Sequence, residues 1–268
     1  MALLTLLSLL GYIFLWRRIS GSNSSSATIH ATSAILLALY IGGLVDLLQP
    51  VTAIVLAGGF LLTAFEATNL VRHKQALPVP MGVLLILCGA FLLLNYGNSF
   101  YLYDEFSHWG IYIREMLSDQ SFWGSDTSAR HPIYVPGPPL WQYFFVRFPG
   151  FTEGGAYLAQ FCLLIAPIIV LWQKVTWRQG FWLLGIFALI ALALSNFGHG
   201  FASLYVDHLL STWFAGTIFN FMLDMKTRTP RQLLSYLLPV TTLALLKDAG
   251  LFFALAASGI MALFIFWE

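Results

Sequence analysis

The residues best suited to chemistry are concentrated in one short stretch, YDEFSHWGIYIREML at residues 103–117. It contains Asp104, Glu105, His108 and Arg114, although only 9% of the residues in the chain are charged. Carboxylate and imidazole side chains can transfer protons, bind a metal ion or hold a polar substrate. Such side chains are costly to place in a membrane, so those that persist there usually serve a function.

The composition indicates that lipid is the main solvent of the chain. Hydrophobic residues make up 59% of the 268 positions, and soluble proteins carry about 25% charged residues by comparison. We therefore predict an all-α, polytopic membrane helix bundle in which residues 1–268 form a single transmembrane domain. The net charge of +1 gives no reason to expect a nucleic-acid partner, and no basic patch with interleaved aromatic residues is visible.

Several stretches are apolar and long enough to be candidate membrane spans, which need roughly 17 to 25 residues. We predict about nine, covering residues 1–16, 28–48, 51–71, 80–98, 156–173, 180–197, 205–223, 232–247 and 251–267. The only long connection is residues 99–155. Long ordered loops in compact folds are usually functional, so this connection is the predicted catalytic loop.

The basic residues predict which side of the membrane this loop faces. Alternate connections carry nine of the 13 Lys and Arg residues, namely Arg17, Arg18, Arg72, Lys74, Lys174, Arg178, Lys226, Arg228 and Arg231. The other side has only Arg114, Arg130, Arg147 and Lys247. Because short cytoplasmic loops hold the excess of basic residues, we expect residues 99–155 on the non-cytoplasmic face of an integral membrane protein. The expected membrane is the bacterial inner membrane or the endoplasmic reticulum.

The first part of the loop has the pattern of an amphipathic helix. Apolar residues at helical spacing form one face, namely Phe106, Trp109, Ile113 and Met116, and the opposite face carries Glu105, His108, Tyr112, Glu115 and Asp119. We expect this helix to lie along the membrane surface with its apolar face in lipid and its acids toward water. A simple interfacial anchor would have the same pattern.

A proline-rich segment, ARHPIYVPGPPLWQYFF, follows at residues 129–145. Four prolines between 132 and 139 are expected to exclude a helix and to favour an extended, rigid backbone. Such a segment can line a substrate groove. It can also be a loop that re-enters the membrane interface on Trp141, Tyr143 and Phe144.

Further polar residues are predicted on the same side of the membrane as the loop. The expected topology brings together Asp104, Glu105, His108, Arg130, His131, Asp207, His208, Lys247 and Asp248. Three others, His30, Asp46 and Glu66, fall inside predicted spans, where hydrogen bonding between helices is the simplest role. Cys88 and Cys162 also fall inside spans and are expected to be small core residues.

These residues resemble the GT-C superfamily of glycosyltransferases, which use polyprenyl-phosphate-linked sugars. The Asp-Glu pair beside an aromatic residue is similar to that of protein O-mannosyltransferases, and Asp104-Glu105-x-x-His108 is similar to dolichol-phosphate-glucose glucosyltransferases. The sequence IREML resembles lipid A aminoarabinose transferases. HPIYVPGPP, YVDHLL and LKDAGL resemble later elements in the same order. Three predicted spans precede the one that leads into the acidic loop, where the family usually has one.

The resemblance implies an inverting transfer of a sugar from a polyprenyl-phosphate donor to a hydroxyl of a glycan, lipid or protein acceptor. Asp104 would be the general base, and Glu105 would orient Asp104 or bind the sugar. His108 would contact the acceptor or the phosphate, and Lys247 with Arg130 would hold the phosphate. The remaining predicted substrate-binding residues are His131, Tyr134, Asp207, His208 and Asp248.

A metal requirement and two other functions stay open. Asp104, Glu105, Asp207 and His208 are plausible ligands for Mg²⁺ or Mn²⁺, but no compact ligand motif is present, so transfer without a metal is favoured. A proton-coupled transporter would use the membrane acids and His30 as a relay, and it would be expected to show internal repeats, of which none is visible. A non-catalytic membrane scaffold subunit is the third reading.

Overall fold

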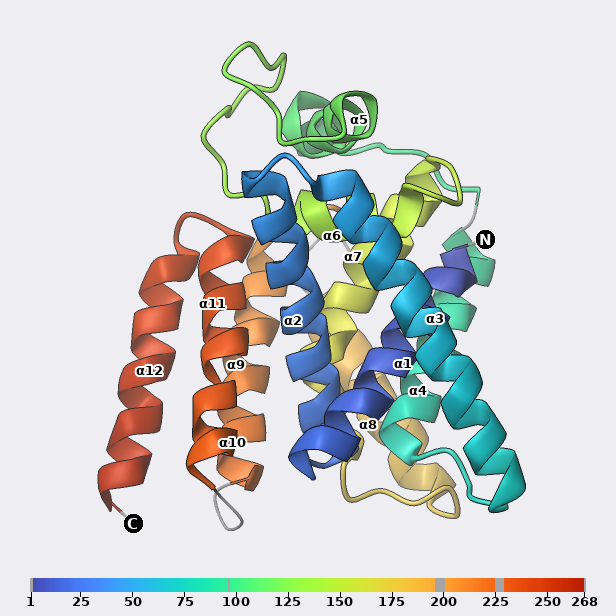
Figure 1. Ribbon diagram of the computed structural model, residues 1–268. Helices are drawn as coiled ribbons and strands as arrows, with labels where there is room; N and C mark the ends of the chain where they lie inside the picture. The colour runs from blue at the N-terminus through green and yellow to red at the C-terminus, as the bar shows by residue number, and fades with distance from the viewer. Residues whose placement is uncertain (1, 96, 196–200, 225–228, 268) are drawn as a thin grey trace.

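The structure, a computed structural model, is all-helical in the part of the chain that it describes. It covers residues 2–95, 97–195, 201–224 and 229–267, and these residues form helices, turns and loops without a strand. Long helices run side by side, and a short helix lies across one end of the bundle (Figure 1). The all-α prediction is therefore confirmed.

The helices of the bundle coincide with the apolar stretches of the sequence. They are α1 (Ala2–Ser20), α2 (Ser24–Leu44), α3 (Leu48–Arg72), α4 (Val79–Asn95), α7 (Glu153–Ile168), α8 (Gly180–Ser195), α9 (Asp207–Asp224), α11 (Leu237–Leu246) and α12 (Gly250–Trp267). The remaining elements are the π-helix η1 (Glu105–Trp109), α5 (Gly110–Asp119), α6 (Gly137–Val146), the 3₁₀ helix η2 (Ile169–Trp172) and α10 (Pro230–Ser235).

Within the described residues, four helices are long and apolar enough to cross a membrane. They are Ser24–Leu44, Leu48–Arg72, Glu153–Trp172 and Gly250–Trp267. The helices Val79–Asn95, Gly180–Ala191 and Gln232–Leu246 are apolar but shorter. These lengths support a membrane protein, and the count of nine spans stays a prediction.

The most buried long helix is the one that continues from α7 into η2. In an apolar 18-residue window of this helix, 89% of the residues are buried, against 22% in the corresponding windows of α3 and α12. A helix that is apolar all round must be surrounded by protein or lipid. Helices α2, α4, α6 and α9 pack around α7, whereas α3 and α12 keep broad apolar faces for lipid.

Hydrogen bonds define one end of the bundle. Asn23 donates to Asp224 at 2.9 Å, Gln173 accepts from the backbone of Ser25 at 3.1 Å, and Trp177 donates to the carbonyl of Leu77 at 2.9 Å. The connections α1–α2, α3–α4 and α7–α8 therefore lie together with the end of α9. Six of the basic residues expected in the cytoplasm lie on these connections or in the helix ends beside them, namely Arg17, Arg18, Arg72, Lys74, Lys174 and Arg178. Whether this end is cytoplasmic stays a prediction.

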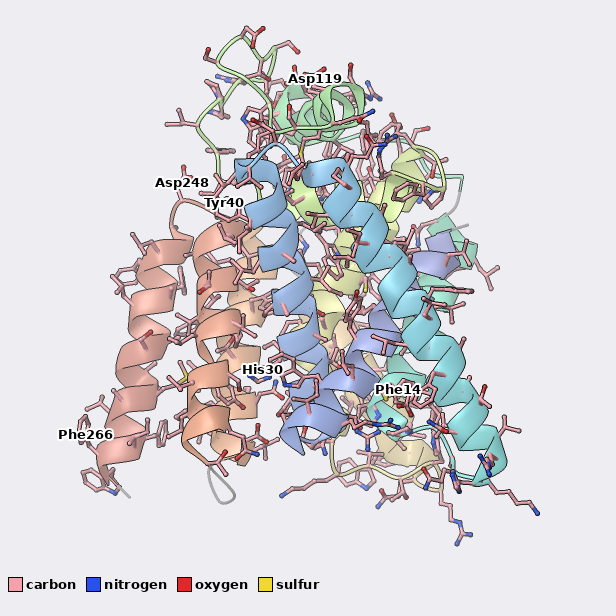
Figure 2. The ribbon with its side chains drawn as sticks, viewed as in Figure 1. Phe14, His30, Tyr40, Asp119, Asp248 and Phe266 are labelled. Carbon is pink, nitrogen blue, oxygen red and sulfur yellow. The ribbon has the colours of Figure 1, made fainter. Side chains whose placement is uncertain are left out.

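The opposite end carries the loop of residues 99–155. Figure 2 shows Asp119 and Asp248 at this end and Phe266 at the other. The ring of Phe122 packs directly on Gly43 near the end of α2, where an added Cβ would lie 2.4 Å from the ring. Gly43 therefore gives the outer loop a close contact with the bundle that a larger residue would block.

The outer helix is present, but its orientation differs from the prediction. Trp109, Ile113 and Met116 are buried against protein instead of facing lipid, while Phe106 is exposed. On the expected water-facing side, Glu105, His108 and Tyr112 are also buried. The π-helix of residues 105–109 has a wider turn, so an α-helical wheel drawn through this segment assigns its faces wrongly.

The proline-rich segment was also predicted wrongly in part. Residues 137–146 form α6, with prolines at its first positions. Prolines are well tolerated there because the first N–H groups of a helix have no partner within the helix. Trp141, Tyr143 and Phe144 are fully buried, so this segment is a core helix and does not re-enter the interface. The backbone of residues 129–136 is non-helical, as expected.

The polar residues assigned to spans have mixed outcomes. The His30 ring contacts the Ser235 hydroxyl at 3.0 Å, and Glu66 pairs with Arg18 at 2.5 Å, so both link helices as predicted. Asp46 was placed wrongly, because it lies in the turn between α2 and α3 with a φ of 57°. Cys88 and Cys162 are free and buried, as expected for core residues.

Candidate functional site

The carboxylate of Glu105 joins three segments of the outer end. One oxygen accepts hydrogen bonds from the N–H groups of Tyr101 and Leu102, both at 3.0 Å, and from the Tyr157 hydroxyl at 2.8 Å. The other oxygen accepts from the N–H of Leu204 at 3.0 Å. The residue is only 1% exposed. Both carboxylate oxygens of Glu105 are thus engaged in hydrogen bonds inside the protein. This burial does not fit the expected role in binding a sugar, but it fits a role in orienting Asp104.

Asp104 lies next to Glu105 and is partly exposed. Its carboxylate is hydrogen-bonded to the side chain of Tyr205, a residue in the loop that leads into α9. Burial raises the pKa of the Tyr205 hydroxyl, and the negative charge of Asp104 raises it further. Tyr205 therefore stays protonated at neutral pH and can steer the carboxylate as a hydrogen-bond donor.

Two cations lie on the segments that flank this acid. Arg130 donates to the hydroxyl of Tyr103 at 2.7 Å, one residue before Asp104. Lys247 pairs with Asp207 at 2.5 Å, two residues after Tyr205. Arg130 thus contacts the residue before Asp104, and Lys247 contacts the start of α9.

Aromatic rings surround His108 on the other side of Asp104. The imidazole lies 5.2 Å from the ring of His131 and 5.3 Å from that of Tyr134, centroid to centroid. The rings of His131 and Tyr134 stack on each other at 4.7 Å, and Tyr134 stacks on Trp109 at 5.4 Å. His131 and Tyr134 are partly exposed and His108 is buried, so a direct contact with substrate is open to the first two.

The environment of His108 favours its neutral form. Burial is the main cause that lowers its pKa to about 4, although the nearby charge of Asp104 acts in the opposite direction. His131 and Arg130 add to the lowering. At neutral pH the imidazole is uncharged, so it does not supply a cation for a phosphate.

Hydrogen bonds hold the rest of the loop over this cluster. The Glu115 carboxylate accepts from the Thr127 hydroxyl at 2.5 Å and from the N–H of Ser128 at 3.1 Å. Trp123 donates to the carbonyl of Pro132 at 2.8 Å, and Tyr112 donates to the carbonyl of His131. These contacts order residues 120–136 although they have no regular structure.

Asp248 and His208 are the remaining predicted site residues. Asp248 is exposed in the turn between α11 and α12 (Figure 2). Burial is the main cause that raises the pKa of Tyr112, and the negative charge of Asp248 adds to it. His208 is buried in the first turn of α9. Among the described residues, no three His, Cys, Asp or Glu side chains are grouped so that they could hold a metal ion. The four ligands considered from the sequence, Asp104, Glu105, Asp207 and His208, therefore do not form such a group.

An apolar groove runs along α4 and reaches Tyr101, three residues before Asp104. A cavity of about 350 Å³ is lined by Trp172, Trp177, Phe187 and residues of α4 and α8. A second cavity of about 400 Å³ shares Leu87, Ala90 and Phe187 with the first and extends to Asn95, Tyr101 and Ala202. The two cavities are therefore neighbours, and the second ends on the segments that carry Asp104 and Tyr205.

Tyr205 and Tyr157 are contacts of the acidic pair that the sequence reasoning missed. Tyr205 stands two positions before Asp207 in YVDHLL, so its place in that motif was a usable signal. Nothing in the pattern around Tyr157 marks it, because it lies in a long apolar helix.

Comparison of the chain with protein-family models, with curated proteins and with solved structures finds no match.

Proposed function

We propose that this chain is a membrane glycosyltransferase that moves a sugar from a polyprenyl-phosphate donor to an acceptor hydroxyl. The observations that carry the proposal are an apolar groove that reaches Tyr101, three residues before Asp104, and two cations, Arg130 and Lys247, that contact Tyr103 and Asp207. The groove ends at Tyr101 and Ala202, and the segments that continue from them carry Asp104, Asp207 and the Lys247 ion pair. A lipid-linked phosphate needs these features side by side.

In the proposed reaction, Asp104 accepts the proton of the acceptor hydroxyl as its oxygen attacks the anomeric carbon of the sugar. The bond between this carbon and the phosphate oxygen breaks, and its electron pair leaves with the phosphate. Because the leaving phosphate is a stable anion, it needs positive charge instead of a proton donor, unlike the alcohol released in glycoside hydrolysis. Arg130 and Lys247 supply that charge.

The other residues support this geometry. Glu105 fixes the segment that carries Asp104 to the segment that carries Tyr205, and the Tyr205 hydroxyl steers the carboxylate. His131 and Tyr134 offer a partly exposed, stacked aromatic surface next to Arg130. We propose that this surface contacts the sugar or the acceptor. The polyprenyl chain lies in the groove along α4.

Donor binding tests the proposal without knowledge of the acceptor. The chain in lipid nanodiscs is titrated with a set of polyprenyl-phosphate sugars, and a matched set of nucleotide sugars serves as the control. We expect saturable binding of at least one lipid-linked sugar, and competition by polyprenyl phosphate alone. Binding of nucleotide sugars only, or of neither set, would overturn the proposal.

A further inference from the structure

A polar cavity lies at the opposite end of the bundle, far along the chain from the acidic loop. It has a volume of about 310 Å³ and is lined by Asn23, Gln173, Lys174, Met222 and Leu223. These residues come from the start of α2, the connection after η2 and the last turns of α9. None of them belongs to the candidate site around Asp104.

Hydrogen bonds join the walls of this cavity. Asn23 donates to Asp224 of α9 at 2.9 Å, and the Gln173 side chain accepts from the N–H of Ser25 at 3.1 Å. Asn23 also caps α2 by accepting from the N–H of Ser26 at 2.8 Å. The three walls are thus tied to one another, so the cavity is a built feature of the bundle end.

Lys174 is the cationic side chain that lines this cavity. Lys174 is exposed and forms no ion pair with any residue that the structure describes. The nearby carboxylate of Asp224 accepts hydrogen bonds from Asn23 and, at 2.8 Å, from Tyr236. An anion in the cavity would therefore find its ion-pair partner in Lys174.

The apolar part of the lining points to a lipid. Met222 and Leu223 are 42% and 41% exposed, and they lie in the last turns of α9 beside the amides and the lysine. A ligand that fits both parts has a negative headgroup joined to acyl chains. A free phosphate would gain only one lysine contact in a water-exposed site, whereas a lipid also buries its chains against these side chains.

We propose that this cavity binds an anionic phospholipid, with its phosphate against Lys174 and its acyl chains along Met222 and Leu223. This site is independent of the proposed transfer reaction. It would join α2, α7 and α9 through one lipid headgroup and stabilise this end of the bundle. Basic pockets between membrane helices bind lipid headgroups by the same chemistry.

The test is the thermal unfolding midpoint of the purified chain in neutral detergent during titration with phosphatidylglycerol. Phosphatidylcholine and inorganic phosphate are separate arms. The variant Lys174→Gln removes the proposed contact, and Lys174→Arg keeps the charge. Lys74→Gln is the matched control, because Lys74 is an exposed lysine at the same end that does not line the cavity.

We expect phosphatidylglycerol to raise the midpoint of the unchanged chain, of Lys74→Gln and of Lys174→Arg. For Lys174→Gln the half-maximal concentration should rise about fivefold, the contribution typical of one basic residue near an anionic surface. If Lys174→Gln and Lys74→Gln need the same half-maximal concentration of phosphatidylglycerol, the proposal is overturned. The effect would then come from the total charge of the protein and not from this cavity. An equal shift with phosphatidylcholine or with inorganic phosphate would also overturn it.

Discussion

The buried carboxylate of Glu105 accepts a hydrogen bond from the N–H of Leu204 at 3.0 Å, across 99 residues of sequence. This contact holds the segment before α9 beside the outer loop, and the side chain of Gln160 holds it as well by donating to the carbonyl of Tyr205 at 2.9 Å. Tyr205 follows Leu204 directly, so the contact also sets where Tyr205 meets Asp104. The position of Asp104, the candidate base, relative to Tyr205 therefore depends on the buried carboxylate of Glu105.

Replacing Glu105 by Gln should destabilise the fold. The amide keeps the size of the side chain but turns an acceptor into a donor that faces the donors already present. We expect a loss of about 1–3 kcal/mol in the free energy of unfolding, typical of a buried group left without its partner. Denaturant unfolding in detergent measures it. Glu115→Gln is the control and should cost less, because Glu115 holds only the partly exposed loop at Thr127 and Ser128. Equal losses in both variants would show that Glu105 has no special linking role.

Removing the charge of Lys247 should weaken donor binding. If Lys247 holds the phosphate, Lys247→Gln should raise the dissociation constant of a polyprenyl-phosphate sugar about tenfold, which corresponds to about 1.4 kcal/mol. Lys247→Arg should retain most of the affinity. Lys74→Gln controls for overall charge. An unchanged dissociation constant in Lys247→Gln would remove this lysine from the proposed phosphate site.

Filling the groove should block the donor chain. Ala90 lines both cavities along α4, so Ala90→Trp should reduce donor affinity strongly. Leu93→Trp is the matched control, because Leu93 lies on the same helix, is highly exposed and lines neither cavity. Both affinities are measured in nanodiscs with the same lipid. If the two tryptophan variants bind the donor equally well, the polyprenyl chain of the donor does not lie in this groove.

Acid should destabilise the outer loop through His108. Its pKa is lowered from 6.5 to about 4 in the folded chain, so the unfolded chain binds the proton more readily. The stabilisation is therefore complete above pH 6.5 and is lost as the pH falls toward 4. His108→Asn should flatten the fall of the thermal midpoint between pH 7 and pH 5, whereas His73→Asn, at an exposed position, should leave it unchanged. A slope that His108→Asn does not alter would contradict the assignment.

Most of the helices could be predicted from the sequence, because a chain in lipid must hydrogen-bond its backbone N–H and C=O groups internally. Long apolar stretches meet this requirement by forming helices. The sequence also predicted which connections share an end, since the basic residues alternate. Asp207 and Lys247 are 40 positions apart in sequence, and the structure pairs them at the end that this alternation required.

Local geometry around Glu105 could not be predicted in the same way. The π-helix at residues 105–109 changes which side chains share a face, and hydrophobic periodicity assumes an α-helix. Polar residues were therefore assigned to water, although Glu105 finds its donors inside the protein. Pro138 and Pro139 led to the wrong prediction of an extended segment. A proline destabilises a helix when it interrupts the helix but is tolerated in the first turn, and the sequence alone does not show which of the two applies.

The most direct test of the proposed function is sugar transfer by Asp104→Asn. Membranes that contain the chain are supplied with the polyprenyl-phosphate sugar that it binds, and the released polyprenyl phosphate is measured together with donor affinity. Loss of the general base should lower the rate at least about 100-fold while leaving donor affinity within a few-fold. Asp119→Asn, at an exposed position of the same loop, should transfer normally. If Asp104→Asn transfers sugar at the rate of the unchanged chain, Asp104 is not the base and the central claim is wrong.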